Sequence, residues 1–144
     1  MKAYLNRRYR FSASHRLHQE TFSAAKNAEV YGKCNNPHGH GHNYVLQVTV
    51  SGPVDPATGM VCNLGDLDAF VGHHILEVLD TTNLNEFSAF RETVPTTENL
   101  CIFLYKTLKS GFQHAAVERV LVEETSNNSF EYAGEKDAAL QRNI

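Results

Sequence analysis

The sequence predicts an α+β fold in which an antiparallel four-stranded sheet carries two helices on one face. Two alternating strand patterns come first, two segments with helical spacing follow, and two further strand patterns complete the order. No repeat or low-complexity segment interrupts this order, and 144 residues are enough for one packed core. We therefore expect a single domain over residues 1–144.

Apolar and polar residues alternate in the first two predicted strands. Residues 3–15 follow a period of two, and residues 40–50 do the same after a polar, aperiodic stretch over 16–33. If the two strands pair antiparallel, the end of the first lies beside the start of the second. His15 would then lie close to His40 and His42.

The middle of the chain shows the spacing of amphipathic helices. Apolar residues recur every three or four positions between Asn63 and Asp80, with Asn63 as a candidate N-cap. A second helix is predicted from Thr96 or Thr97 to about Gly111. Strand patterns then return over 116–125 and 129–133, separated by a short polar turn that favours a hairpin.

Composition excludes several classes of partner. The formal charge of −3 and the isoelectric point near 6.2 argue against nucleic acid and anionic membranes as partners. Charged residues interrupt the N-terminus, nowhere do 18 apolar residues occur in succession, and the three cysteines are widely separated. We expect a cytoplasmic protein without disulfides.

An open sheet in a chain this small has edges to protect, which favours a homo-oligomer.

The stretch CNNPHGHGHNY, residues 34–44, suggests a metal site. Residues two apart on a strand project to one side roughly 6.5–7 Å apart, so two imidazoles can converge on one ion. Three in a straight row cannot do so easily, which favours His40 and His42 over His38, with His15 completing the set. Three imidazoles with an open position are typical of catalytic zinc. The alternative is a solvated histidine-rich loop that binds metal adventitiously.

Cys34 and Glu124 are candidate functional residues near this site. Cys34 lies in a polar loop after Lys33, a setting suited to a thiolate base or nucleophile, although a loop cysteine can equally be incidental. Glu124 continues an apolar strand face, where a ligand with N–H donors, such as the amino-pyrimidine edge of a pterin, would satisfy it. The alternative is a strand-end carboxylate in water.

Five motifs carry a resemblance to a known family. FSASHRLH, YGKCNNPHGHGHNY, DPATGMVCNLGDL, PTTEN and VEETSNN occur in an order and spacing that resemble the 6-pyruvoyl tetrahydropterin synthase family over about residues 8–134. The five residues between the cysteine and His-Gly-His favour this branch over the related 6-carboxytetrahydropterin synthases of queuosine biosynthesis, which typically have a shorter spacer.

The resemblance implies a set of site residues. It makes His15, His40 and His42 the ligands of Zn²⁺, and Cys34 the residue that moves a proton. Glu124 would anchor the pterin ring, with Thr96 and Thr97 hydrogen bonding near it. The triphosphate site stays open among Lys33, Arg16 and Arg91.

The resemblance also implies a fold and a reaction. The fold is the tunnelling fold, ββααββ, whose subunits join their sheets into a β-barrel as trimers that stack into a homohexamer with active sites between subunits. The reaction converts 7,8-dihydroneopterin triphosphate to 6-pyruvoyl tetrahydropterin with elimination of triphosphate, a carbon-oxygen lyase step in tetrahydrobiopterin biosynthesis. The alternatives are a 6-carboxytetrahydropterin synthase or a pterin-binding homologue with weakened catalysis.

The sequence departs from this family at one position. Relatives carry Leu-Asp-His after the first helix, whereas this chain reads LDTTNL, so Asp80 is followed by Thr81. A threonine hydroxyl does not ionise near neutral pH and cannot replace an imidazole in a proton relay. Three explanations stay open: Asp80 and water form a slower relay, another histidine such as His38 or His74 substitutes, or the reaction is altered.

Overall fold

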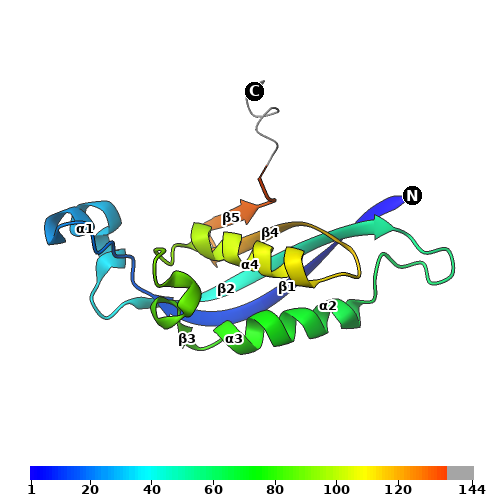
Figure 1. The fold of residues 1–144 in the computed structure, drawn as a ribbon, viewed down its shortest axis with the longest axis horizontal. Coiled ribbons are helices and arrows are strands. Elements are labelled where there is room, and N and C mark those ends of the chain that lie inside the picture. The colour runs from blue at the N-terminus through cyan, green and yellow to red at the C-terminus, as the bar shows by residue number, and fades with distance from the viewer. Residues whose placement is uncertain (136–144) are drawn as a thin grey trace, which may run out of the picture.

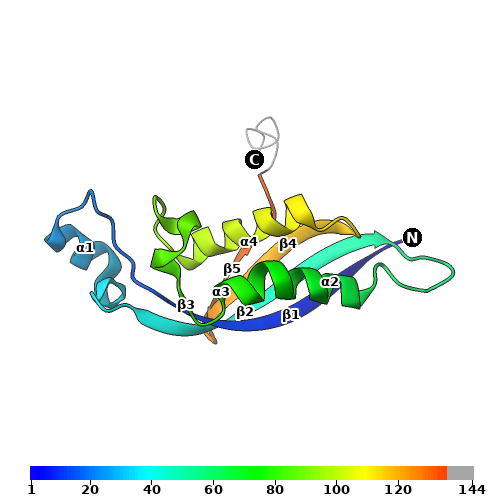
Figure 2. The same cartoon turned by 60° about the horizontal axis from the view of Figure 1, so that its bottom comes forward.

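The protein consists of one twisted β-sheet with helices on one of its faces. The structure is a computed structural model that describes residues 1–135. Helices α2, α3 and α4 cover one face of the sheet, and the segment around α1 projects from one end of the molecule (Figures 1 and 2). The elements are β1 (Lys2–His15), α1 (Ala24–Tyr31), β2 (His40–Pro53), α2 (Leu64–Val71), α3 (Glu77–Leu79), β3 (Thr82–Asn83), α4 (Thr97–Gly111), β4 (Ala116–Thr125) and β5 (Asn128–Tyr132).

The sheet has five strands in the order β3-β1-β2-β4-β5, so the predicted four-stranded antiparallel sheet was incomplete. The four predicted strands pair antiparallel, and the hairpin of β4 and β5 is confirmed. The added strand β3 runs parallel to β1. It has only two residues, too few for an alternating pattern, and its position depends on a contact distant in sequence: Thr81 N–H donates to Ser12 O over 2.6 Å.

The stretch over 16–33, expected to be irregular, contains α1 and a following 3-10 turn, Gly32–Asn35. Its polar composition conceals the helix, because a buried amide rather than an apolar face organises it. The Asn27 Oδ1 accepts from Gln19 N–H at 2.8 Å, and its Nδ2 donates to Gln19 O at 3.0 Å. Ser23 caps the helix by accepting from Lys26 N–H.

The longest pairing joins β1 and β2, which run antiparallel from Lys2↔Pro53 to His15↔His40. Their inward residues, among them Phe11, Tyr44 and Leu46, are almost fully buried against the helices. The two periodicities predicted the strands, and the antiparallel pairing considered for them is confirmed. The buried residues of these two strands extend the hydrophobic core along the sheet as far as the end that holds the histidines.

Both predicted helices are present. The first runs from α2 through a π-helical turn, Gly72–Leu76, into α3, and Asn63 caps it by accepting from Gly65 N–H at 2.8 Å. The second, α4, is capped by Thr96, whose hydroxyl accepts from Asn99 N–H at 3.2 Å.

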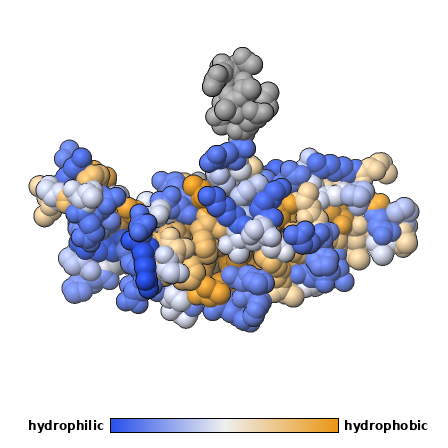
Figure 3. Space-filling view, viewed as in Figure 1, coloured by the Kyte–Doolittle hydropathy of each residue, from blue (hydrophilic) through white to orange (hydrophobic). Residues whose placement is uncertain are grey.

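The surface over the helices is partly apolar. In the space-filling view, apolar colour appears in the middle of the face, over the helices and the adjoining sheet, whereas the segment around α1 is mainly hydrophilic (Figure 3). Within residues 1–135, no helix is long and apolar enough to cross a membrane.

We predict that Gly111→Ala destabilises the fold. A Cβ at Gly111 would lie 2.6 Å from a ring carbon of Phe70, so the ring would have to move. Overpacking of this kind costs about 1–3 kcal/mol. Gly72→Ala is the matched control: nothing lies within 4 Å of its added Cβ and its backbone is helical, so it should stabilise by about 0.4–1 kcal/mol. Urea unfolding measures both, and equal stabilities would contradict the prediction.

Candidate metal centre

Four side chains from three adjacent strands converge at the end of the sheet. His15 on β1, His40 and His42 on β2, and Glu124 on β4 bring one ligand atom each to within 4.8 Å of one another. The pairing explains the convergence, because His15 lies directly opposite His40 and β4 is the other neighbour of β2. Antiparallel pairing thus assembles the predicted three-histidine cluster and adds a carboxylate to it.

His15 is held in one orientation and one tautomer. Its side chain is 1% exposed, and Nδ1 lies 2.7 Å from Pro95 O. A carbonyl oxygen only accepts, so Nδ1 carries the proton and donates it. The lone pair of Nε2 is therefore directed toward His40, whose Nε2 lies 3.0 Å away. This is the form in which an imidazole binds a metal.

His42 contributes a buried nitrogen that lacks a hydrogen bond. Its Nε2 lies 2.9 Å from Glu124 Oε1, yet the alignment does not meet hydrogen-bond geometry, and the atom has no hydrogen-bond partner among the described residues. We take the proximity as electrostatic rather than as a hydrogen bond. A buried nitrogen left in this state is costly unless another group satisfies it, and a cation between the imidazoles and the carboxylate would do so.

Burial favours the neutral form of His15 and His42. It lowers the pKa of His15 and the pKa of His42 below the ordinary value of 6.5, and the neighbouring imidazoles act in the same direction. Both lone pairs are then available at neutral pH. Burial also raises the pKa of Tyr44, whose hydroxyl lies 3.5 Å from His15 Nδ1, so the phenol stays protonated there.

Gly39 permits the close approach of the loop to β1. It has a positive φ of 70°, and a Cβ would lie 2.9 Å from His15 O. Only glycine adopts this conformation readily without a clash. The residue before His40 therefore lets β2 start directly beside the end of β1.

Glu124 lies between the histidines and the start of α4. Its side chain is 16% exposed, and its Oε2 accepts a hydrogen bond of 2.9 Å from Thr97 Oγ1. The Thr96 hydroxyl instead caps α4, so the two threonines differ in role. Glu124 retains acceptor capacity toward the open side of the site.

Cys34 lies in the 3-10 turn, partly exposed and with a free thiol. Its carbonyl accepts from Leu17 N–H at 2.9 Å, which holds the loop against the chain just beyond His15. Within the described part of the chain, no hydrogen bond links its thiol to the histidine cluster. The structure thus fixes the Cys34 backbone next to the site and leaves the thiol available.

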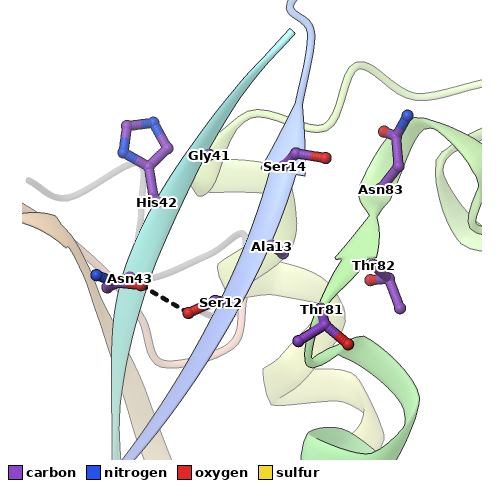
Figure 4. Close-up of a pocket in the computed structure, with 9 residues that line it drawn as sticks. All are labelled: Ser12, Ala13, Ser14, Gly41, His42, Asn43, Thr81, Thr82 and Asn83. Atoms are coloured by element: carbon purple, nitrogen blue, oxygen red, sulfur yellow. Dashed lines mark hydrogen bonds between the residues drawn. The ribbon is translucent and has the colours of Figure 1, made fainter.

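Asp80 and Thr81 lie two strands away from His42. Figure 4 shows His42 on β2, Ser12 to Ser14 on β1, and the Thr81 to Asn83 segment beyond them. These residues line a groove of about 500 Å³. The Asp80 Oδ1 accepts from Ser12 N–H at 2.8 Å, and the Thr81 hydroxyl donates to the Asp80 carbonyl. Thr81 also has a φ of 60°, rare for a β-branched residue. Neither the Asp80 nor the Thr81 side chain belongs to the cluster of three histidines and Glu124.

The other candidate histidines differ in position. His38 and His15 line the same small hollow, whereas His74 packs its ring against Phe70 at 4.4 Å on the helical layer.

Sequence reasoning missed Pro95, because its carbonyl rather than its side chain orients His15. It also missed Tyr44 as a neighbour of His15, although Tyr44 lies two residues after His42 on β2.

The donor set fits a divalent transition metal. Neutral imidazoles and a carboxylate suit zinc, and the arrangement can acidify groups bound next to it. The Glu124 carboxylate can neutralise part of the ion's charge or accept from a ligand. The geometry supports a metal site without identifying the metal.

Comparison with known proteins places this geometry in context. A family model described as 6-pyruvoyl tetrahydropterin synthase matches residues 4–135. The human protein named 6-pyruvoyl tetrahydrobiopterin synthase is 44% identical over 135 residues, covering 93% of each chain. A protein from Archaeoglobus fulgidus, named a putative 6-carboxy-5,6,7,8-tetrahydropterin synthase, is 35% identical over 88 residues, covering 61% of this chain and 70% of its own length.

A solved structure agrees over nearly the whole chain. The structure of Caenorhabditis elegans 6-pyruvoyl tetrahydropterin synthase superposes with a TM-score of 0.89 at 42% identity, covering 94% of this chain and 97% of that one. The resemblance noted in the sequence therefore extends to the three-dimensional fold.

We predict that the metal-free protein loses stability as the pH falls below about 6.5. The buried His15 and His42 have lowered pKa values, so the unfolded chain binds more protons in this range and acid favours unfolding. Urea unfolding in a chelator, followed from neutral to mildly acidic pH, measures the decline. His42→Gln should reduce the decline, whereas exposed His73→Gln should not. A reduction by His73→Gln alone would contradict the assignment.

Proposed function

Because the chain belongs to the 6-pyruvoyl tetrahydropterin synthase family, we propose that it is a zinc-dependent lyase acting on 7,8-dihydroneopterin triphosphate. The products are 6-pyruvoyl tetrahydropterin and inorganic triphosphate. The observation that carries the proposal is the convergence of His15, His40, His42 and Glu124 within 4.8 Å. This cluster lies at the end of the sheet, next to the cysteine loop and the start of α4.

His15, His40 and His42 would hold the zinc ion. A bound ion supplies Lewis acidity that makes the C–H bonds beside the substrate's side-chain hydroxyls more acidic. His15 is prepared for this role because Pro95 O fixes its Nδ1 proton and leaves Nε2 unprotonated. His42 is prepared because its buried Nε2 has no hydrogen-bond partner within residues 1–135.

Glu124 would bind the pterin ring. A carboxylate accepts two hydrogen bonds in parallel from the amino group and ring N–H of an amino-pyrimidine. Thr97 donates to Oε2 at 2.9 Å and so restrains the carboxylate, while Oε1 is directed toward the histidines. Ring binding at Glu124 would bring the side chain of the pterin over the histidine cluster.

Cys34 would take the proton from the substrate side chain. The Cys34 carbonyl is anchored to Leu17 N–H, so the thiol is carried by a loop held beside the end of β1. As a thiolate it can accept a carbon-bound proton, and a second group must then return that proton to another atom of the side chain. Asp80 is the candidate for this second group.

The position of Asp80 supports a shared active site. Within one chain, its carboxylate accepts from Ser12 N–H and lies two strands from His42. On this proposal, Asp80 reaches the substrate from another copy of the chain. We therefore propose a homo-oligomer, a trimer or hexamer, in which neighbouring copies complete each site.

The main alternative is a 6-carboxytetrahydropterin synthase, which would use the same metal and the same substrate. The spacing in residues 34–42 favours the pyruvoyl reaction, because five residues lie between Cys34 and the His40 that begins the His-Gly-His motif. The product distinguishes the two reactions, since the carboxy enzyme releases acetaldehyde.

The direct test incubates the zinc-loaded protein with 7,8-dihydroneopterin triphosphate and follows the products by mass spectrometry. We expect inorganic triphosphate and 6-pyruvoyl tetrahydropterin in equal amounts. A chelator should abolish the activity and added zinc should restore it, because neutral imidazoles without the ion cannot acidify the C–H bonds. Absence of triphosphate release at every pH tested would refute the proposal, and a carboxylated pterin with acetaldehyde would favour the alternative.

Thr81 generates a second prediction. The relay implied by the family uses a histidine after Asp80, so Thr81→His should raise kcat on the order of a hundredfold if the relay is limiting. The same change also replaces a β-branched residue at a φ of 60°.

Thr81→Asn is the matched control, because asparagine tolerates positive φ but transfers no proton. A gain with histidine alone would indicate a broken relay. Equal gains with both would indicate backbone strain instead. No gain with either would indicate that another group, such as His38, already performs the transfer.

A further inference from the structure

A second hollow lies beside the histidine cluster and is bordered by cationic side chains. It has a volume of about 340 Å³, and its lining includes Arg16, His18, Asn85, Arg91 and Pro95. Pro95 connects it to the metal centre, because the Pro95 carbonyl orients His15. We propose that this hollow binds the polyphosphate tail of the substrate, an inference that rests on the proposed function.

The strand order places the hollow where such a tail would lie. Across the end of the sheet, Glu124 is on β4, His40 and His42 are on β2, and His15 is on β1. The next segments outward are β3 and Asn85, which follows it and lines the hollow. The order is thus carboxylate, metal centre, arginine hollow. The substrate has the same order: pterin ring, hydroxylated carbons, then the triphosphate ester.

Arg16 is fixed at the edge of the hollow. Asn85 binds both backbone groups of Arg16, accepting from its N–H at 2.7 Å and donating to its carbonyl at 2.8 Å. The Arg16 Nε donates to Asn35 O at 3.1 Å. Within residues 1–135 the two terminal amino groups make no hydrogen bond, so they remain available as a fork for phosphate oxygens.

Arg91 is exposed and makes no ion pair with the described residues, although two carboxylates also border the hollow. Glu20 is 93% exposed and lies 3.8 Å from His18 Nε2, and Glu92 is exposed at the rim. Neither is within ion-pair distance of Arg16 or Arg91.

Three of the four other arginines on the sheet form ion pairs within the described part of the chain, and Arg10 does not. Arg7, Arg8 and Arg119 each lie 3.0–3.1 Å from a carboxylate oxygen. Both arginines of the hollow combine a guanidinium without an ion pair to the described residues with a position beside the histidine cluster, and a guanidinium stays charged at any physiological pH. A polyanion is the ligand that satisfies them best.

The experiment measures two probes separately by calorimetry on the zinc-loaded protein. Inorganic triphosphate reports on the hollow, and 7,8-dihydroneopterin without phosphate reports on the pterin site. Arg91→Gln and Arg16→Gln should each weaken triphosphate binding about tenfold, as expected for loss of one charged hydrogen-bonding group, and leave dihydroneopterin binding unchanged. Lys106→Gln, an exposed α4 residue away from the hollow, removes the same charge and should change neither.

The outcomes separate the inference from the proposed function. Triphosphate binding unchanged in both arginine variants, or weakened equally by Lys106→Gln, would overturn the assignment of the hollow while dihydroneopterin binding still supported a pterin enzyme. Failure of the unmodified protein to bind dihydroneopterin would instead count against the proposed function. Arg91→Gln keeps the test valid if Arg16→Gln does not fold, because Arg91 is exposed and makes no side-chain hydrogen bond within the described part of the chain.

Discussion

The antiparallel register between β1 and β2 is the constraint on which the site depends. It sets His15 opposite His40 and carries His42 on the same face two residues further along. Because side chains alternate between faces, a slip of one residue would turn the β2 histidines away from the helical layer. The same register buries Phe11, Tyr44 and Leu46, so the packing of the core and the assembly of the site are fixed by one pairing.

This arrangement gathers polar groups that the protein alone satisfies only in part. His15 is almost fully buried, and its proton is committed to Pro95 O. His42 Nε2 has no hydrogen bond within the described residues, and Glu124 stays beside it. Desolvation lowers the pKa of both imidazoles, so they stay neutral at neutral pH. Protonation therefore does not compensate for the missing hydrogen bond. A metal ion at this point would satisfy the lone pairs and balance the carboxylate.

Much of the fold and the convergence of the three histidines could be predicted from the sequence, because both follow from periodicity. Alternation predicted β1 and β2 as strands, and antiparallel pairing between them, taken as a hypothesis, predicted the cluster of three histidines. The fifth strand could not be predicted, because Thr82 and Asn83 are positioned by a distant contact between Thr81 and Ser12. Helix α1 was missed because the buried amide of Asn27, rather than an apolar face, organises it. Arg16 and Arg91 were candidates for the triphosphate site on charge alone, but that they line one hollow could not be predicted, because they are far apart in sequence.

The most direct test of a metal centre at the end of β1 and β2 is a crystal structure of the zinc-loaded protein with data collected at the zinc absorption edge. We expect one anomalous peak per chain, bounded by the Nε2 atoms of His15, His40 and His42. A chain with no peak there, or with its peak at His73 or His74 on the helical layer, would contradict the account.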